Sequence, residues 1–210
     1  MKLDEIREPQ KISLNRFRLL ICFGILLAGA TIGVIQKLLD AVAFNELPGI
    51  LQSLDITNYF GRFAIWILIG TILSVYARRP LHAGINVFLF FIGMLAGYYI
   101  YCNYVLHFLP KTYMMMWIAV ACVSPIMAIV CWYAKGEEVP AIIISAVILG
   151  VLFSQAFLIT QGFYVTHALE VITWIVGVCI LYRKPKEFVI EMVLSIVVAF
   201  VYQMFIPYWG

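Results

Sequence analysis

Seven mostly apolar stretches of 18 or more residues follow one another along the chain, and they leave little room for any fold outside a membrane. A helix needs about 20 such residues to cross about 30 Å of hydrocarbon. Clusters that combine charge with Pro or Gly, such as Arg78-Arg79-Pro80, separate the stretches. We therefore predict an all-α, polytopic transmembrane helix bundle of about seven spans, folded as a single domain over residues 1–210. The predicted spans are 17–37, 59–77, 84–106, 112–133, 139–159, 165–182 and 188–207.

Composition supports the lipid bilayer as the surroundings of this chain. Hydrophobic residues make up 64% of it and charged residues 12%, whereas an average soluble domain has about 25% charged residues. A transmembrane β-barrel is excluded because the stretches are continuously apolar instead of alternating with a period of two. The net charge of +3 comes from loops beside the spans, which favours contact with anionic headgroups and excludes nucleic acid as a partner.

The basic residues give an orientation, because Lys and Arg accumulate on the cytoplasmic side of a membrane. An N-terminus inside and a C-terminus outside put all but three of the 14 Lys and Arg residues in the cytoplasm, including those of a basic tail at 1–16. We expect a multi-pass protein of a cell membrane, the inner or plasma membrane of a bacterium. In an alternative, Leu19–Leu27 followed by Ala28-Gly29-Ala30 is a cleaved signal peptide, which leaves six spans.

The longest loop, residues 38–58, is predicted to be external and amphipathic. Leu47, Ile50, Leu51 and Leu54 recur at helical spacing, and Pro48 suits a first helical turn. Such a segment lies flat at the membrane interface, as a lid over a site or as a tether.

Small residues at helical spacing predict close contacts between helices, since lipid provides little hydrophobic drive for their association. Gly29 and Gly33 form one such face, and Gly93 and Gly97 another. These faces serve either packing within the bundle or the docking of a partner membrane protein.

Polar residues inside a span are costly and mark candidate sites. In the orientation above, most of them fall in the outer half of the membrane: Gln36, Arg62, Tyr98, Tyr99, Asn103, His107, Gln155, Thr160, His167, Glu170, Tyr202 and Gln203. Two helical stripes, Tyr99-Asn103-His107 and His167-Glu170-Trp174, are predicted to line one outward-facing cavity. The candidate ligand-binding residues are Arg62, Tyr99, Asn103, Gln155, His167, Glu170 and Trp174.

Glu170 is the leading candidate, because it lies about one and a half turns inside its span, where Arg62 is placed to pair with it. Glu191 is instead expected in a surface ion pair near Lys184 and Lys186. If Glu170 orients a ligand, Glu170→Gln is expected to weaken binding more than folding.

Motifs with catalytic chemistry are absent. The sequence contains no HExxH, GxSxG or Walker phosphate loop, and its five cysteines are scattered through separate spans. We therefore expect no catalytic residues, no metal and no cofactor.

The stretch Ala77 to Tyr99, with Cys131-Trp-Tyr-Ala-Lys-Gly136, resembles an uncharacterised group of multi-pass bacterial membrane proteins. In size, span count and its long first external loop the chain is also similar to the substrate-binding subunits of energy-coupling-factor vitamin transporters. That similarity implies a docking role for the faces of the first helix, at Gly29 and Gly33.

Two main hypotheses of function follow. In the first, the protein binds or transports a small solute through the cavity, alone or as a transporter subunit. In the second, it is an accessory, immunity or sensory subunit that docks a protein partner. An intramembrane enzyme is a third possibility.

Overall fold

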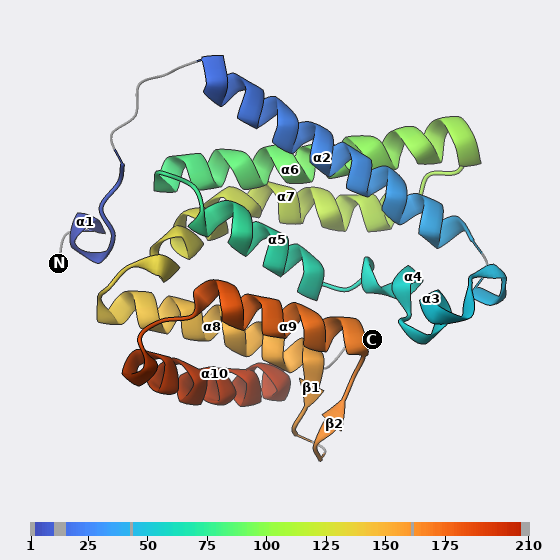
Figure 1. Ribbon diagram of the computed structural model, residues 1–210. Coiled ribbons are helices and arrows are strands. Elements are labelled where there is room, and N and C mark those ends of the chain that lie inside the picture. Colours follow the sequence, from blue (N-terminus) through green and yellow to red (C-terminus); the bar gives the residue numbers. More distant parts are fainter. Residues whose placement is uncertain (1–2, 11–15, 43, 161, 207–210) are drawn as a thin grey trace.

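The chain is a helical membrane protein built almost entirely of helices (Figure 1). A computed structural model describes residues 3–10, 16–42, 44–160 and 162–206. The elements are α1 (Leu3–Ile6), α2 (Arg16–Ala41), η1 (Phe44–Glu46), α3 (Gly49–Ser53), α4 (Ile56–Tyr59), α5 (Ala64–Val75), α6 (Pro80–Tyr101), η2 (Cys102–Leu106), α7 (Lys111–Trp132), η3 (Tyr133–Lys135), α8 (Val139–Ala156), β1 (Phe157–Leu158), β2 (Tyr164–Val165), α9 (Ala168–Leu181) and α10 (Pro185–Phe205).

Helix length separates these elements into two groups. Five helices of the described chain are long and apolar enough to cross a membrane, namely α2, α6 with η2, α7 with η3, α8 and α10. Each lies within a few residues of a predicted span. The other two predicted spans are shorter as helices: α5 has 12 residues and α9 has 14, or about 18 and 21 Å. Their polar N-terminal flanks, around Arg62 and His167, do not continue the helices.

Four of the five long helices form two pairs, and α2 crosses α6 at an oblique angle (Figure 1). Helix α2 packs along α6, α8 packs along α10, and α5 and α9 lie between the pairs. Helix α7 packs mainly on α6 and α5. One departure from the all-α prediction is a small antiparallel hairpin, in which Phe157 pairs with Val165 and Leu158 with Tyr164. The loop 38–58 forms three short helical pieces, η1, α3 and α4, instead of one amphipathic helix.

Glycines explain the close contact of α2 with α6. A Cβ added at Gly33 would lie 2.1 Å from the carbonyl oxygen of Met94, and one at Gly93 would lie 2.2 Å from that of Leu26. Gly29 and Gly97 face backbone at the same distance, 2.1 Å. The two faces therefore cover each other within the chain, so neither of them is a free surface for a partner.

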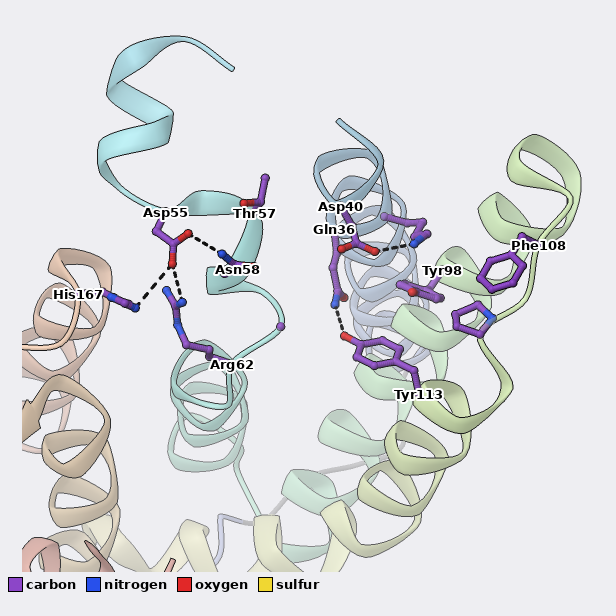
Figure 2. A pocket seen from close by; sticks show the side chains of 13 residues that line it. Gln36, Asp40, Asp55, Thr57, Asn58, Arg62, Tyr98, Phe108, Tyr113 and His167 are labelled. Atoms are coloured by element: carbon purple, nitrogen blue, oxygen red, sulfur yellow. Dashed lines mark hydrogen bonds and ion pairs between the residues drawn. The ribbon is translucent and has the colours of Figure 1, made fainter. Parts of the chain in front are cut away.

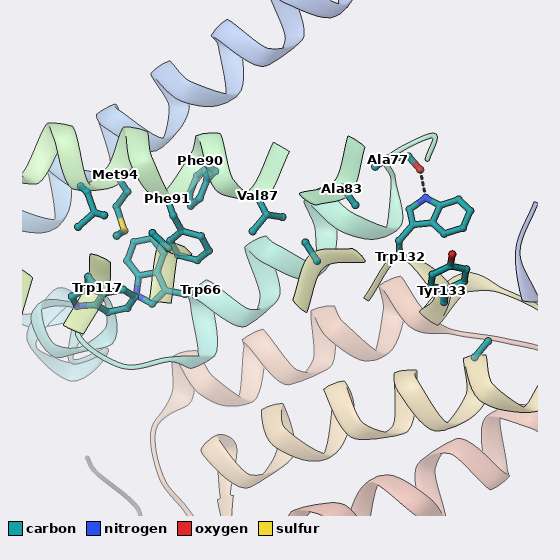
Figure 3. Close-up of a cluster of buried hydrophobic side chains, with 14 of the residues drawn as sticks. Trp66, Ala77, Ala83, Val87, Phe90, Phe91, Met94, Trp117, Trp132 and Tyr133 are labelled. Carbon is teal, nitrogen blue, oxygen red and sulfur yellow. Dashed lines mark hydrogen bonds between the residues drawn. The ribbon is translucent and has the colours of Figure 1, made fainter. Parts of the chain in front are cut away.

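An aromatic cluster fills the space between α5, α6 and α7 (Figure 3). The Trp66 ring lies 5.5 Å from that of Trp117 and 6.3 Å from those of Phe90 and Phe91, and its indole N–H donates to the Phe60 carbonyl at 2.9 Å. A large rigid side chain thereby fixes the start of α5. The position of α5 in turn places the adjacent Arg62.

Pro125 lies inside α7 and has no N–H to donate to the Ala121 carbonyl. The Ser124 hydroxyl donates to that carbonyl at 2.9 Å. The proline is therefore accommodated without leaving a buried carbonyl unpaired.

Residues 3–10 are bound to the end of the bundle that carries the α5–α6 and α7–α8 connections. Arg7 donates to the carbonyls of Val75, at 2.8 Å, and Trp132, at 2.5 Å, and it stacks on the Trp132 ring at 4.3 Å. Buried Ile6 covers Gly136, where an added Cβ would lie 2.2 Å from the Ile6 carbonyl oxygen. Arg7 thus joins the C-terminal ends of α5 and α7, where a cation is favoured.

Arg7→Ala is expected to release residues 3–10 from this end, because the remaining contacts there are mainly backbone hydrogen bonds and Ile6. Hydrogen exchange of the Glu137 amide, which donates to the Ile6 carbonyl, measures the release. Glu8→Ala, at an exposed neighbouring position, is the matched control. Equal protection in both variants would contradict an anchoring role for Arg7.

Candidate functional site: a polar pocket beside a buried ion pair

A cavity of about 680 Å³, here called the polar pocket, opens at the end of the bundle opposite residues 3–10. Its volume falls within the range typical of small-molecule sites. Two walls face each other across it (Figure 2). One wall comes from α4, the start of α5 and the start of α9, and the other from α2, α6 and α7. The lining residues are Gln36, Lys37, Asp40, Asp55, Thr57, Asn58, Gly61, Arg62, Tyr98, Phe108, Pro110, Tyr113 and His167.

Arg62 organises the first wall. Its Nε donates to Glu170 Oε1 and its Nη1 donates to Asp55 Oδ2 at 2.7 Å. Glu170 is fully buried in the first turn of α9, where a helix N-terminus favours a carboxylate. The pairing of Glu170 with Arg62 that the sequence predicts is confirmed. Arg62 Nη2 has no hydrogen-bond partner among the described residues.

Asp55 and His167 complete this wall. Asp55 precedes α4 with a left-handed backbone, φ 51°, and its carboxylate accepts from Arg62 and from Asn58 Nδ2 at 2.7 Å. His167 Nδ1 lies 2.8 Å from the Thr166 carbonyl, which can only accept, so Nδ1 carries a proton. In neutral His167 the other nitrogen, Nε2, is then an acceptor, and it lies 3.7 Å from Asp55 Oδ2. Two acceptors thus lie side by side on this wall.

Lys37 dominates the second wall. Its Nζ pairs with Asp40 Oδ2 at 2.5 Å and lies 5.3 Å from the centre of the Tyr98 ring. The Lys37 side chain is 11% exposed, whereas that of Asp40 is 52% exposed. Beside it, Gln36 Nε2 donates to the Tyr113 hydroxyl at 2.9 Å. A buried cation is therefore balanced here by a carboxylate that reaches into solvent.

The structure brings together three of the seven predicted site residues. Arg62 and His167 line the polar pocket, and Glu170 lies behind Arg62. Gln155 is buried at the end of α8 and does not line the pocket. Its backbone carbonyl accepts a hydrogen bond from Thr166 Oγ1. Trp174 packs instead against Phe153 and Phe157, with ring centres 5.5 and 5.4 Å apart.

The predicted stripe Tyr99-Asn103-His107 does not line the cavity. Tyr99 is 43% exposed, Asn103 is exposed too, and neither contributes to the polar pocket. The prediction assumed continuous α-helix, but Cys102–Leu106 is a π-helical turn, in which each N–H bonds to the carbonyl five residues earlier instead of four, and this shifts the side chains of Asn103 and His107 relative to Tyr99. Tyr98, one position earlier, lines the pocket.

Sequence reasoning missed the residues of the second wall and Asp55 as site residues. Gln36 and Tyr98 carried a signal, because they belong to the outer polar group. Lys37, Asp40 and Asp55 gave no such signal, because Lys37 ends the predicted span 17–37 and the two aspartates lie in the loop 38–58.

The expected surface pairing of Glu191 is wrong. Glu191 is fully buried, and its carboxylate lies 3.7 Å from Arg183 Nε instead of pairing with Lys184 or Lys186. Arg183 also donates to the carbonyls of Ala134 and Gly136. This second buried ion pair lies near residues 3–10, far from the polar pocket, and joins α10 to the α7–α8 connection.

Comparison with known proteins identifies a family. A model described as a family of unknown function, DUF6518, matches residues 14–209. The chain belongs to this family. The match agrees with the resemblance to an uncharacterised group, whereas a similarity to energy-coupling-factor subunits is not shown. No curated protein and no solved structure matches the chain.

Proposed function

We propose that this DUF6518 protein binds a small polar solute in the polar pocket and passes it on, alone or as the membrane subunit of a transporter. The observation that carries the proposal is a cavity of solute size whose walls hold Lys37 and Arg62, two cations buried to about nine tenths. Burying such charges is costly in an apolar surrounding. A binding site gives them a purpose that packing alone does not.

In this proposal the chain crosses the membrane seven times, with its N-terminus in the cytoplasm. The support is the charge of the two ends: Arg7, Arg78, Arg79, Lys135 and Arg183 share one end, as the positive-inside rule expects of a cytoplasmic face. The short helices α5 and α9 begin at the opposite end. Because neither is long enough to cross about 30 Å of hydrocarbon alone, the polar pocket lies recessed within the outer half of the bundle.

Docking of a partner is the alternative function, and the structure gives it no specific support. The glycine faces that suggested it are occupied by each other.

Native mass spectrometry of the full chain, purified from membranes in mild detergent, tests the proposal. A retained small molecule is expected, and it is expected to be lost in Asn58→Trp, whose larger side chain fills the pocket. Thr31→Trp, on an exposed face of α2, is the control for the added bulk. A retained polypeptide, or protein that is empty in every preparation, would contradict solute binding.

A further inference from the structure

We infer that the protein has a second site, in which a phospholipid inserts one acyl chain between α7 and α8 and places its phosphate beside Lys135. The inference goes beyond the proposed function and does not depend on it. It follows from a cavity of about 710 Å³, here called the apolar cavity, which is lined by residues of α5, α6, α7 and α8. None of the residues that line it belongs to the lining of the polar pocket.

The apolar cavity opens sideways between two consecutive helices. Helix α7 packs mainly on α6 and α5, and α8 packs mainly on α10 and α9, so α7 and α8 make little contact with each other. Met127 of α7 and Ile143 of α8 both line the cavity, and they are 55% and 51% exposed. Because both helices are long and apolar enough to cross a membrane, the opening faces lipid hydrocarbon.

The interior of the apolar cavity is deep and offers water few partners. Its deep wall includes Trp66, Phe91 and Trp117 of the aromatic cluster, which are all buried (Figure 3). Gly70 of α5 also lines it, and a Cβ added there has nothing within 4 Å. An apolar space does not hold water well, and an empty one loses packing contacts along its walls. A hydrocarbon ligand meets both conditions.

The length of the apolar cavity favours an extended chain. Along α7 its lining runs from Trp117 to Cys131, which is about 21 Å at 1.5 Å per residue. One leaflet of a bilayer contributes about 15 Å of hydrocarbon, half of the total thickness. An acyl chain fills such a space from end to end, whereas a compact apolar molecule fills only part of it.

A buried hydroxyl in the apolar cavity has room for one polar group of the ligand. Three hydroxyls line the cavity, and two of them donate within their own helices: Ser74 to the Gly70 carbonyl at 2.6 Å, and Ser124 to the Ala121 carbonyl at 2.9 Å. The third, Thr71, is 2% exposed and has no hydrogen-bond partner among the described residues. The ester carbonyl of a phospholipid accepts such a hydrogen bond.

A cation stands at one end of the apolar cavity, where the phosphate of this lipid belongs. Cys131 is the last lining residue of α7, and Lys135 follows four positions later. Its Nζ lies 5.7 Å from the centre of the Tyr76 ring, directly after α5. Lys135 is exposed, and in the described part of the chain it forms no ion pair, with Glu137 and Glu138 included.

The positions of Lys135 and Thr71 agree with one lipid. Thr71 lies four residues before the end of α5 at Val75, or about 6 Å along the helix axis, and the ester of a phospholipid lies just below its phosphate. A lysine at the membrane surface attracts anionic headgroups. The lipid therefore comes from the leaflet at the end of the bundle that binds residues 3–10, and its chain runs from there toward Trp117.

Fluorescence quenching in nanodiscs tests the position of the chain. A minor fraction of the lipid is phosphatidylglycerol with brominated acyl chains, because bromine quenches an indole only in close contact. Trp66 and Trp117 are buried from the surrounding bilayer but line the apolar cavity. We expect less quenching in Gly70→Leu, whose side chain fills the cavity, than in the parent. Gly24→Leu, which also adds its side chain to open space but lies outside the cavity, is expected to match the parent.

Equal quenching in Gly70→Leu and Gly24→Leu would overturn the inference. A second pair of variants acts at the opening and does not alter the interior. Val147→Phe, at an exposed position of the cavity lining, is expected to reduce quenching, and Val193→Phe, exposed on α10, is its control. Thermal unfolding verifies that each variant folds.

The headgroup is tested by the same quenching, with brominated phosphatidylglycerol compared with brominated phosphatidylcholine. We expect the parent to favour the anionic lipid by about fivefold, as one lysine near the surface provides. Lys135→Gln is expected to remove this preference, whereas Lys111→Gln, exposed at the start of α7, keeps it. A preference that persists in Lys135→Gln, or that is absent from the parent, would overturn the placement of the phosphate.

Discussion

Replacing Gly33 with valine is expected to destabilise the protein by about 3 kcal/mol or more, and to reduce the yield of monodisperse protein in detergent. The first carbon of any side chain there meets the Met94 carbonyl oxygen at 2.1 Å, and backbone cannot move aside as a flexible side chain does. Helices α2 and α6, which pack against each other over much of their length, would then have to move apart. Thermal unfolding with size-exclusion chromatography measures the effect.

Gly24→Val is the matched control, since Gly24 lies in the same helix and a Cβ added there has nothing within 4 Å. It is expected to unfold close to the temperature of the parent. Comparable losses in both variants would show that valine disturbs α2 itself, and the contact with α6 would not be responsible.

Removing the Glu170 carboxylate is expected to cause the second large loss of stability. In Glu170→Leu a buried guanidinium loses one of its two carboxylates, and breaking a buried ion pair in this way costs about 3 to 5 kcal/mol. The double variant Arg62→Met, Glu170→Leu is expected to regain part of this loss, because no uncompensated charge remains in the wall. The parent, the two single variants Arg62→Met and Glu170→Leu, and the double variant form a double-mutant cycle. Their free energies of unfolding give the coupling energy between the two side chains.

Glu46→Leu, the same substitution at an exposed position, is expected to change stability by less than about 0.5 kcal/mol. A Glu170→Leu protein as stable as this control would show that the pair contributes nothing. From the sequence we expected Glu170→Gln to weaken ligand binding more than folding. Because Glu170 is a fully buried partner of Arg62, we now expect this substitution to weaken folding as well as ligand binding.

The helices of this protein were predictable because lipid imposes one rule on every span. Continuous apolar sequence has to be helical for its backbone groups to be bonded, so α6, α7 and α8 lie near their predicted bounds. The short helices were less predictable. Gly61 and Arg62 are only two polar or flexible positions in an apolar stretch, yet Arg62 bonds to Asp55 and Glu170, which holds the chain before Ala64 out of the helix.

The site was predictable only where two signals coincided. Arg62 and Glu170 are opposite charges at one depth in neighbouring spans, so their pairing followed from the cost of burying either alone. The second wall depended on tertiary structure. Lys37 and Tyr98 meet because the glycines of α2 and α6 set the register of these helices, and no pattern within either segment contains that information.

The attachment of residues 3–10 has a consequence for the order in which the protein assembles. Arg7 bonds to the carbonyl of Trp132, 125 positions later in the chain, and Ile6 bonds to the Glu137 amide. Synthesis runs from the N-terminal side, so residues 3–10 are made before either partner; the Val75 carbonyl becomes available with α5, but the binding surface is complete only once α7 has been inserted. Residues 3–10 therefore complete their contacts only after a large part of the bundle has been assembled.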